Sequence, residues 1–148
     1  MATLTVDAKQ WNMVLWNLSL LTPKNGVTEG KVLLEIRSEI GFIDGFASDD
    51  FIIIRDQVEF VYADEHPLPI HQFVVGVADL KTMETETRKA TGQLDVSLFD
   101  VGEGMLLRLE GEGMDLIEVS IEDPPSLWND LAELIRSQYS DQAFAQPF

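Results

Sequence analysis

The chain has 148 residues, which suits one domain or two small halves that share a core. Its hydrophobic fraction of 45% is too high for a disordered acidic chain, and no apolar run approaches the roughly 20 residues of a membrane-spanning helix. With 26 carboxylates and a net charge of −16, the surface as a whole repels phosphates, and without cysteine there is no thiol chemistry. The N-terminus is unlike a signal peptide, so we expect a cytoplasmic protein.

The first part of the chain reads as a strand, a helix and three more strands. Residues 3–7 alternate apolar and polar side chains, which is typical of a strand. Asp7 then suits the N-cap of a helix. The apolar side chains of that helix recur at helical spacing: Trp11, Val14, Leu15, Leu18 and Leu21. Three strands are predicted at 31–40, 41–49 and 51–62.

The same order of elements then repeats after a linker at 64–71 that contains two prolines. A strand at 73–78 leads into a helix for which Asp79 suits the N-cap and Gly92 the stop. Three strands follow, separated by two Gly-Glu-Gly turns that are typical of an antiparallel meander: 93–101, 105–110 and 115–122. An internal repeat of this kind predicts an α+β domain over residues 1–123, with halves at 3–63 and 72–122.

A third helix is predicted at 124–139, because Pro125 suits a first helical turn. The residues expected to form one stripe along this helix are Leu127, Leu131, Leu134, Ile135 and Gln138. Residues 140–148 are expected to form a flexible tail.

The second helix, drawn as a wheel of about 100° per residue, has two unlike faces. A weakly apolar face holds Leu80, Met83, Thr87 and Ala90. The opposite face holds Lys81, Thr85, Arg88 and Lys89, which include three of the ten basic residues in the chain. Such a strip suits a solvated helix face. It suits DNA contact only if many copies line one surface, because three cations neutralise few phosphates.

The doubled strand-helix-strand-strand-strand order resembles DNA sliding clamps, the ring-shaped processivity factors of replicative polymerases. The resemblance covers residues 3–122. Three phrases look similar to the clamp elements at the same places: "TVDAKQWNMVLWNLS", "GFIDGFASDDFIIIRD" and "GVADLKTMETETRKATGQLDVSLFD". A clamp domain has two such halves, whose helices line the hole of the ring and whose sheets form an acidic outer wall.

The sequence has no Ser/His/Asp order, P-loop or dinucleotide-binding fingerprint, so we expect neither enzymatic activity nor a cofactor. Clamp rings contain six such domains, so a chain with one domain implies a homohexamer with head-to-tail contacts. The partners implied are double-stranded DNA, contacted at its phosphates without regard to sequence, a DNA polymerase and a clamp loader. The side chains implied to face DNA are Lys9, Lys81, Thr85, Arg88 and Lys89.

The first helix also has an apolar outer face, made by Met13, Trp16 and Leu20. Such a patch needs a partner. We expect the C-terminal helix to pack across it, and a contact with a neighbouring subunit is the alternative. The tail "QAFAQPF" is either a disordered end or a docking peptide, because many proteins dock on clamps through short segments with Gln and aromatic residues. Phe144 and Phe148 are therefore further interface candidates.

Other chemistry has weaker support in the sequence. The segment with Asp64, Glu65, His66 and His71 lacks a recognised metal-ligand spacing, and we expect no metal site there. Asp49 and Asp50 are expected in a turn between strands rather than in a catalytic carboxylate pair. Two other functions stay open: an acidic protein-protein adaptor with a clamp-like fold, and a structural or assembly subunit of a larger particle such as a phage.

Overall fold

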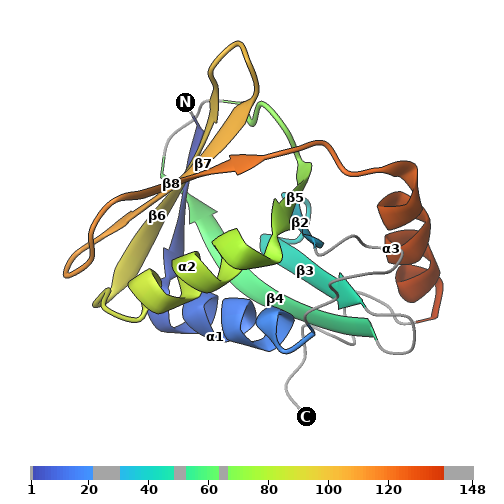
Figure 1. Cartoon of the computed structure of the whole chain (residues 1–148), viewed down its shortest axis with the longest axis horizontal. Helices are drawn as coiled ribbons and strands as arrows, with labels where there is room; N and C mark the ends of the chain where they lie inside the picture. Colours follow the sequence, from blue (N-terminus) through green and yellow to red (C-terminus); the bar gives the residue numbers. More distant parts are fainter. Residues whose placement is uncertain (1, 22–30, 49–52, 64–66, 139–148) are drawn as a thin grey trace.

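The computed structural model describes residues 2–21, 31–48, 53–63 and 67–138, and all structural statements below concern these residues (Figure 1). The first half of the chain follows the predicted order of elements. Its bounds are β1 (Ala2–Asp7), α1 (Ala8–Ser19), β2 (Lys31–Arg37), β3 (Phe42–Ser48) and β4 (Ile53–Tyr62).

The second half repeats this order and is followed by the third helix. Its bounds are β5 (Gln72–Gly76), α2 (Val77–Thr87), β6 (Gln93–Asp100), β7 (Met105–Gly111), β8 (Ile117–Ile121) and α3 (Ser126–Gln138). Among the described residues, no helix is long and apolar enough to cross a membrane.

The two helix starts differ in how well they were predicted. Asp7 is the N-cap of α1, and its carboxylate accepts a 3.0 Å hydrogen bond from the backbone N–H of Gln10, as expected. The prediction of Asp79 as the N-cap of α2 is wrong. The helix begins directly where β5 ends, with Gly76 at the cap, so Asp79 lies in the first turn. There its negative charge still suits the positive end of the helix dipole.

Each half gives its first strand to the other half. The strand order is β5-β2-β3-β4-β1-β6-β7-β8, in which β1 pairs with β6 of the second half and β5 pairs with β2 of the first. All these pairings are antiparallel. A bridge between Val74 and Glu122 joins β5 to the end of β8 and brings the two ends of the sheet together. The two halves are therefore related by an approximate twofold symmetry, and each contributes its first strand to the sheet of the other.

The main core lies between the sheet and the two helices α1 and α2. Val32, Leu34 and Ile36 of β2 point into it together, because alternate residues of a strand share one face of the sheet. The buried face of α1 consists of Ala8, Trp11, Val14, Leu15 and Leu18. Gly45 of β3 permits a close approach here, because a Cβ atom at that position would lie 2.5 Å from Leu18 Cδ1. The sequence therefore brings α1 directly onto β3.

The helix α3 lies on the opposite face of the sheet from α1 and α2, which corrects the expectation that it covers Met13, Trp16 and Leu20 (Figure 1). It packs on a row of apolar side chains that crosses three neighbouring strands: Val74 of β5, Leu33 of β2 and Phe46 of β3. The contacting side chains of α3 are Trp128, Leu131, Ala132 and Ile135. The predicted stripe was therefore partly wrong, and Leu134 is exposed.

Comparing the two halves explains why α3 packs on the first half of the sheet and not on the second. The matching rows across β1, β6 and β7 in the second half are polar. One contains Thr5, Asp95 and Glu110, and the other contains Thr3, Ser97 and Arg108. The row of Val74, Leu33 and Phe46 in the first half therefore offers more apolar surface to bury than either of these two rows.

Beside that apolar row, the same sheet face holds a buried carboxylate. Asp44 is fully buried and accepts hydrogen bonds from Arg55 at 3.0 Å and from the side chain of Gln57. Arg37 lies 3.5 Å from the same carboxylate. Because a buried charge is tolerated only when it is paired, this cluster adds polar contacts to the strands that α3 covers.

Two tryptophan-to-alanine variants test the placement of α3. Trp128 is 2% exposed, so Trp128→Ala is expected to lower the free energy of unfolding by about 3–5 kcal/mol. Trp16 is 50% exposed, and Trp16→Ala is expected to change it by only about 0.5 kcal/mol. Urea denaturation followed by circular dichroism measures both. A larger loss from Trp16→Ala than from Trp128→Ala would contradict this packing.

Candidate nucleic-acid interface

The helices α1 and α2 lie side by side and run in opposite directions over the sheet (Figure 1). Asn12 of α1 joins them by donating hydrogen bonds from Nδ2 to the backbone oxygen of Glu84 at 2.6 Å and to Thr87 Oγ1 at 3.2 Å. At the start of α1, the backbone N–H of Ala8 donates to the carbonyl of Gly92 at 2.9 Å. These bonds fix the two helices as one layer whose outer surface faces away from the sheet.

The outer face of α2 presents its predicted residues to solvent. Lys81, Thr85, Arg88 and Lys89 are all exposed, although Arg88 and Lys89 lie in the turn just after the last helical residue. Leu80, Met83 and Thr87 are buried on the opposite face, as the wheel predicted. The structure thus brings the four polar side chains together on one surface.

Two of the three cations are paired with carboxylates of the same helix. Arg88 Nε donates to Glu84 Oε1 at 3.0 Å, and Lys89 Nζ lies 3.0 Å from Glu86 Oε2. The side chain of Glu84 is only 8% exposed and that of Glu86 19%, whereas Arg88 and Lys89 are 61% and 56% exposed. Each pair therefore turns its positive end outward and holds its negative end against the protein.

The pairing partners of these groups shift their pKa values. The backbone N–H of Asp115, 3.1 Å from Glu86 Oε1, and then the Lys89 ammonium lower the pKa of Glu86 below its ordinary 4.5. The hydrogen bonds from Arg88 to Glu84 raise the pKa of the Arg88 guanidinium above its ordinary value. Both shifts favour the charged forms, that of the Glu86 carboxylate and that of the Arg88 guanidinium.

The outer face of α1 differs from that of α2. Lys9 is exposed at its start, but the next three outward side chains are apolar: Met13, Trp16 and Leu20, exposed by 61%, 50% and 56%. The predicted apolar patch is therefore real. No described segment of the chain covers it.

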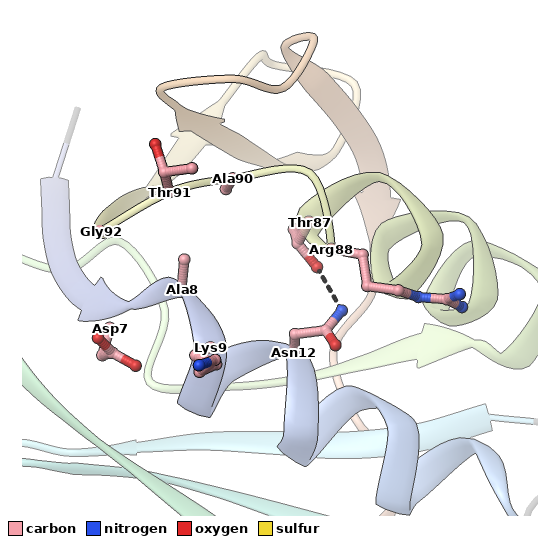
Figure 2. A pocket seen from close by; sticks show the side chains of 9 residues that line it. All are labelled: Asp7, Ala8, Lys9, Asn12, Thr87, Arg88, Ala90, Thr91 and Gly92. Carbon is pink, nitrogen blue, oxygen red and sulfur yellow. Dashed lines mark hydrogen bonds between the residues drawn. The ribbon is translucent and has the colours of Figure 1, made fainter.

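A hollow of about 500 Å³ lies between the start of α1 and the end of α2 (Figure 2). Lys9 and Asn12 line it from α1, and Thr87, Arg88 and the backbone around Gly92 line it from the other side. Two cationic side chains and one carboxylate, that of Asp7, border this space. It opens onto the same outer layer as the strip on α2.

Other predicted sites lie partly outside the described residues. Asp49, Asp50, Asp64, Glu65, His66, Phe144 and Phe148 belong to segments that the structure does not describe. Within the described ranges, no group of three His, Asp or Glu side chains is placed to hold a metal ion. Sequence reasoning missed Asn12, because nothing in the sequence separates it from the other polar side chains of α1, such as Gln10 and Asn17. It also missed Glu84, a carboxylate that lies about 40° from Leu80 on the helical wheel and is buried.

Comparison with known proteins identifies the fold. No protein family matches the sequence, and no curated protein sequence does so either. Solved structures do match. The DNA polymerase sliding clamp of Pseudomonas aeruginosa superimposes with a TM-score of 0.60 and 13% sequence identity, over 83% of this chain and 31% of that chain.

Two further solved structures also match this fold. The DNA polymerase III beta chain of Streptococcus pneumoniae TIGR4 matches with a TM-score of 0.60 at 9% identity, over 83% of this chain and 32% of that one. The beta sliding clamp of C. crescentus matches with a TM-score of 0.60 at 17% identity, over 84% of this chain and 31% of that one. The chain has the fold of a single sliding-clamp domain and spans about a third of the clamp chains it matches.

The depressed pKa of Glu86 predicts a pH dependence of stability. A carboxyl group whose pKa is lowered by folding stabilises the protein above its unfolded pKa, near 4.5, and this contribution is lost as the pH falls through the folded value. Glu86→Gln is therefore expected to be less stable than the wild type at pH 6, with the gap closing below pH 4.5. Urea denaturation across this pH range measures the difference in the free energy of unfolding between Glu86→Gln and the wild type. Glu103→Gln, on the β6–β7 turn, is the control. A gap that widens in acid would contradict the assigned contacts.

Proposed function

We propose that this protein is a sliding-clamp-like processivity factor that forms a ring around duplex DNA and tethers a replicative polymerase. The observation that carries the proposal is the outward presentation of the α2 cations on the fold of a clamp domain. In such a ring, the α1–α2 layer of every copy lines the hole. The cations then contact phosphates, and such contacts bind DNA without regard to its sequence.

The charge distribution supports this orientation. The α1–α2 layer, residues 7–20 and 77–92, contains four carboxylates and four cations: Asp7, Asp79, Glu84 and Glu86 with Lys9, Lys81, Arg88 and Lys89. The net charge of the layer is therefore zero, and the excess of −16 belongs to the rest of the chain. Because carboxylates repel phosphates, the net negative charge of the rest of the chain disfavours DNA binding outside this layer.

Two strand edges supply surfaces for ring closure. β4 pairs with β1 only through residues 60–62, so its earlier part has a described strand, β3, on one side alone. β8 pairs with β7 along its length, and its other edge meets β5 only at Glu122. An unpaired edge is a template for strand addition from another chain. A contact between the β4 edge of one copy and the β8 edge of the next is head-to-tail and closes into a ring.

Cross-linking tests this contact, because the chain has no cysteine of its own. The double variant Glu59→Cys with Ser120→Cys places one thiol on β4 and one on β8, both at exposed positions. A short bismaleimide is expected to give a ladder that ends at six chains, each of 16.6 kDa. Neither single variant is expected to cross-link. Dimers from a single variant would point to a twofold contact and against the ring.

Charge reversal tests the DNA-facing surface. The triple variant with Lys81→Glu, Arg88→Glu and Lys89→Glu is expected to lose duplex binding, with the salt dependence of binding falling by about 0.9 for each phosphate contact removed. Lys9→Glu is expected to cost less, since it removes one cation where the triple variant removes three. Fluorescence anisotropy over a salt series measures both. Equal effects of Lys9→Glu and the triple variant would contradict the assignment.

A protein-protein adaptor is the second candidate. The exposed apolar side chains of Met13, Trp16 and Leu20 favour it, because aromatic residues and methionine are enriched at protein interfaces. For an adaptor, the triple charge reversal leaves partner binding intact, whereas for a clamp it removes retention on DNA. The same variants therefore separate the two functions.

A further inference from the structure

The apolar face of α1 is poorly matched to duplex DNA. A duplex stacks its bases inside and presents charged phosphates outside, so Met13, Trp16 and Leu20 gain nothing by losing water against it. Unpaired bases do offer apolar faces, on which aromatic side chains stack. The side chain with the right chemistry is Trp16, which is half exposed and points away from the sheet.

The positions of the cations relative to Trp16 follow from the contacts between the helices. Ala8 meets Gly92 and Asn12 meets Glu84, so one further turn along α1 brings Trp16 to the level of Lys81. On a helical wheel Trp16 lies about 40° from Asn12, which places it on the side of α1 that faces α2.

Arg88 and Lys81 share one flank of α2. They are seven residues apart, which is close to two full turns and about 10 Å along the axis. Asn12 of α1 bonds to Glu84 and Thr87, and Arg88 lies about 40° from Glu84 on a helical wheel, so this flank is on the α1 side of the helix. The α1–α2 layer thus carries an exposed indole on α1 and two exposed cations on the neighbouring flank of α2.

We propose that this face of the α1–α2 layer binds single-stranded DNA, with Trp16 as the stacking platform for an unpaired base and with Lys81 and Arg88 as partners of the neighbouring phosphates. The inference rests on the proposed DNA contact of the same layer and extends it to a second form of DNA. A strand running between the helices places its phosphates along the α2 flank and its bases over α1. The combination of a basic surface with an aromatic platform is what binds single strands without sequence preference.

A second copy of the chain fits this face less well. Met13, Trp16 and Leu20 have the i, i+3, i+7 spacing of a helix–helix seam. A symmetric pairing through this face, however, places two copies of the same outward cations, those of Arg88 and Lys89, in one interface. Single-stranded DNA meets the same cations with opposite charge.

The test compares Trp16→Ala with Trp16→Phe in the full-length protein. The probes are fluorescein-labelled oligothymidylate and a mixed-sequence duplex, measured by anisotropy at low salt. Trp16→Ala is expected to weaken oligothymidylate binding by about 5- to 150-fold and duplex binding by less than about twofold, whereas Trp16→Phe keeps most of the affinity. Leu134→Ala, at an exposed apolar residue of α3, is the control and is expected to change neither.

Three results would overturn the inference. They are no binding of oligothymidylate by the wild type, equal losses on both probes with Trp16→Ala, and a drop in oligomer mass with Trp16→Ala while oligothymidylate binding is unchanged. The last would assign the face to a second copy. The proposed clamp function fails by a different result, namely unchanged duplex binding in the triple charge reversal at Lys81, Arg88 and Lys89.

Discussion

The exchange of first strands between the halves is the constraint on which the rest of the structure depends. Because β1 completes the sheet of the second half and β5 that of the first, neither half has a complete sheet alone. The exchange also places α1 and α2 next to each other over one core. A single outer layer of two antiparallel helices follows, and it leaves the β4 and β8 edges at corresponding places in the two halves.

Within that layer, the positions of the carboxylates decide what the surface can bind. Counted as formal charges, α2 and its following turn are neutral, and a count alone predicts no affinity for DNA. The positions of the charges, however, are not equivalent at the surface. Glu84 is buried, and Glu86 accepts a hydrogen bond from the backbone N–H of Asp115. The positive ends of both pairs therefore extend outward. Phosphates approach the cations more closely than the carboxylates, and Coulomb interactions decay with distance.

Much of the fold could be predicted from the sequence, because alternation, helical spacing and Gly-Glu-Gly turns are local signals. They placed every strand within a few residues and identified the exposed faces of α1 and α2. Non-local choices could not be predicted. The position of α3 depends on one apolar row that forms only when β5, β2 and β3 are side by side. The link from Asn12 to Glu84 likewise depends on the packing of two helices 72 residues apart in the chain.

Topological retention on DNA tests the central claim most directly. The variant with Glu59→Cys and Ser120→Cys can be mixed with nicked circular DNA, closed with the bismaleimide and then transferred to denaturing detergent. A ring around DNA predicts that the cross-linked protein stays with the circle and is released when a restriction enzyme linearises it. Equal release from circular and linear DNA would contradict encirclement, and with it the assignment of the α1–α2 layer to the inside of a ring.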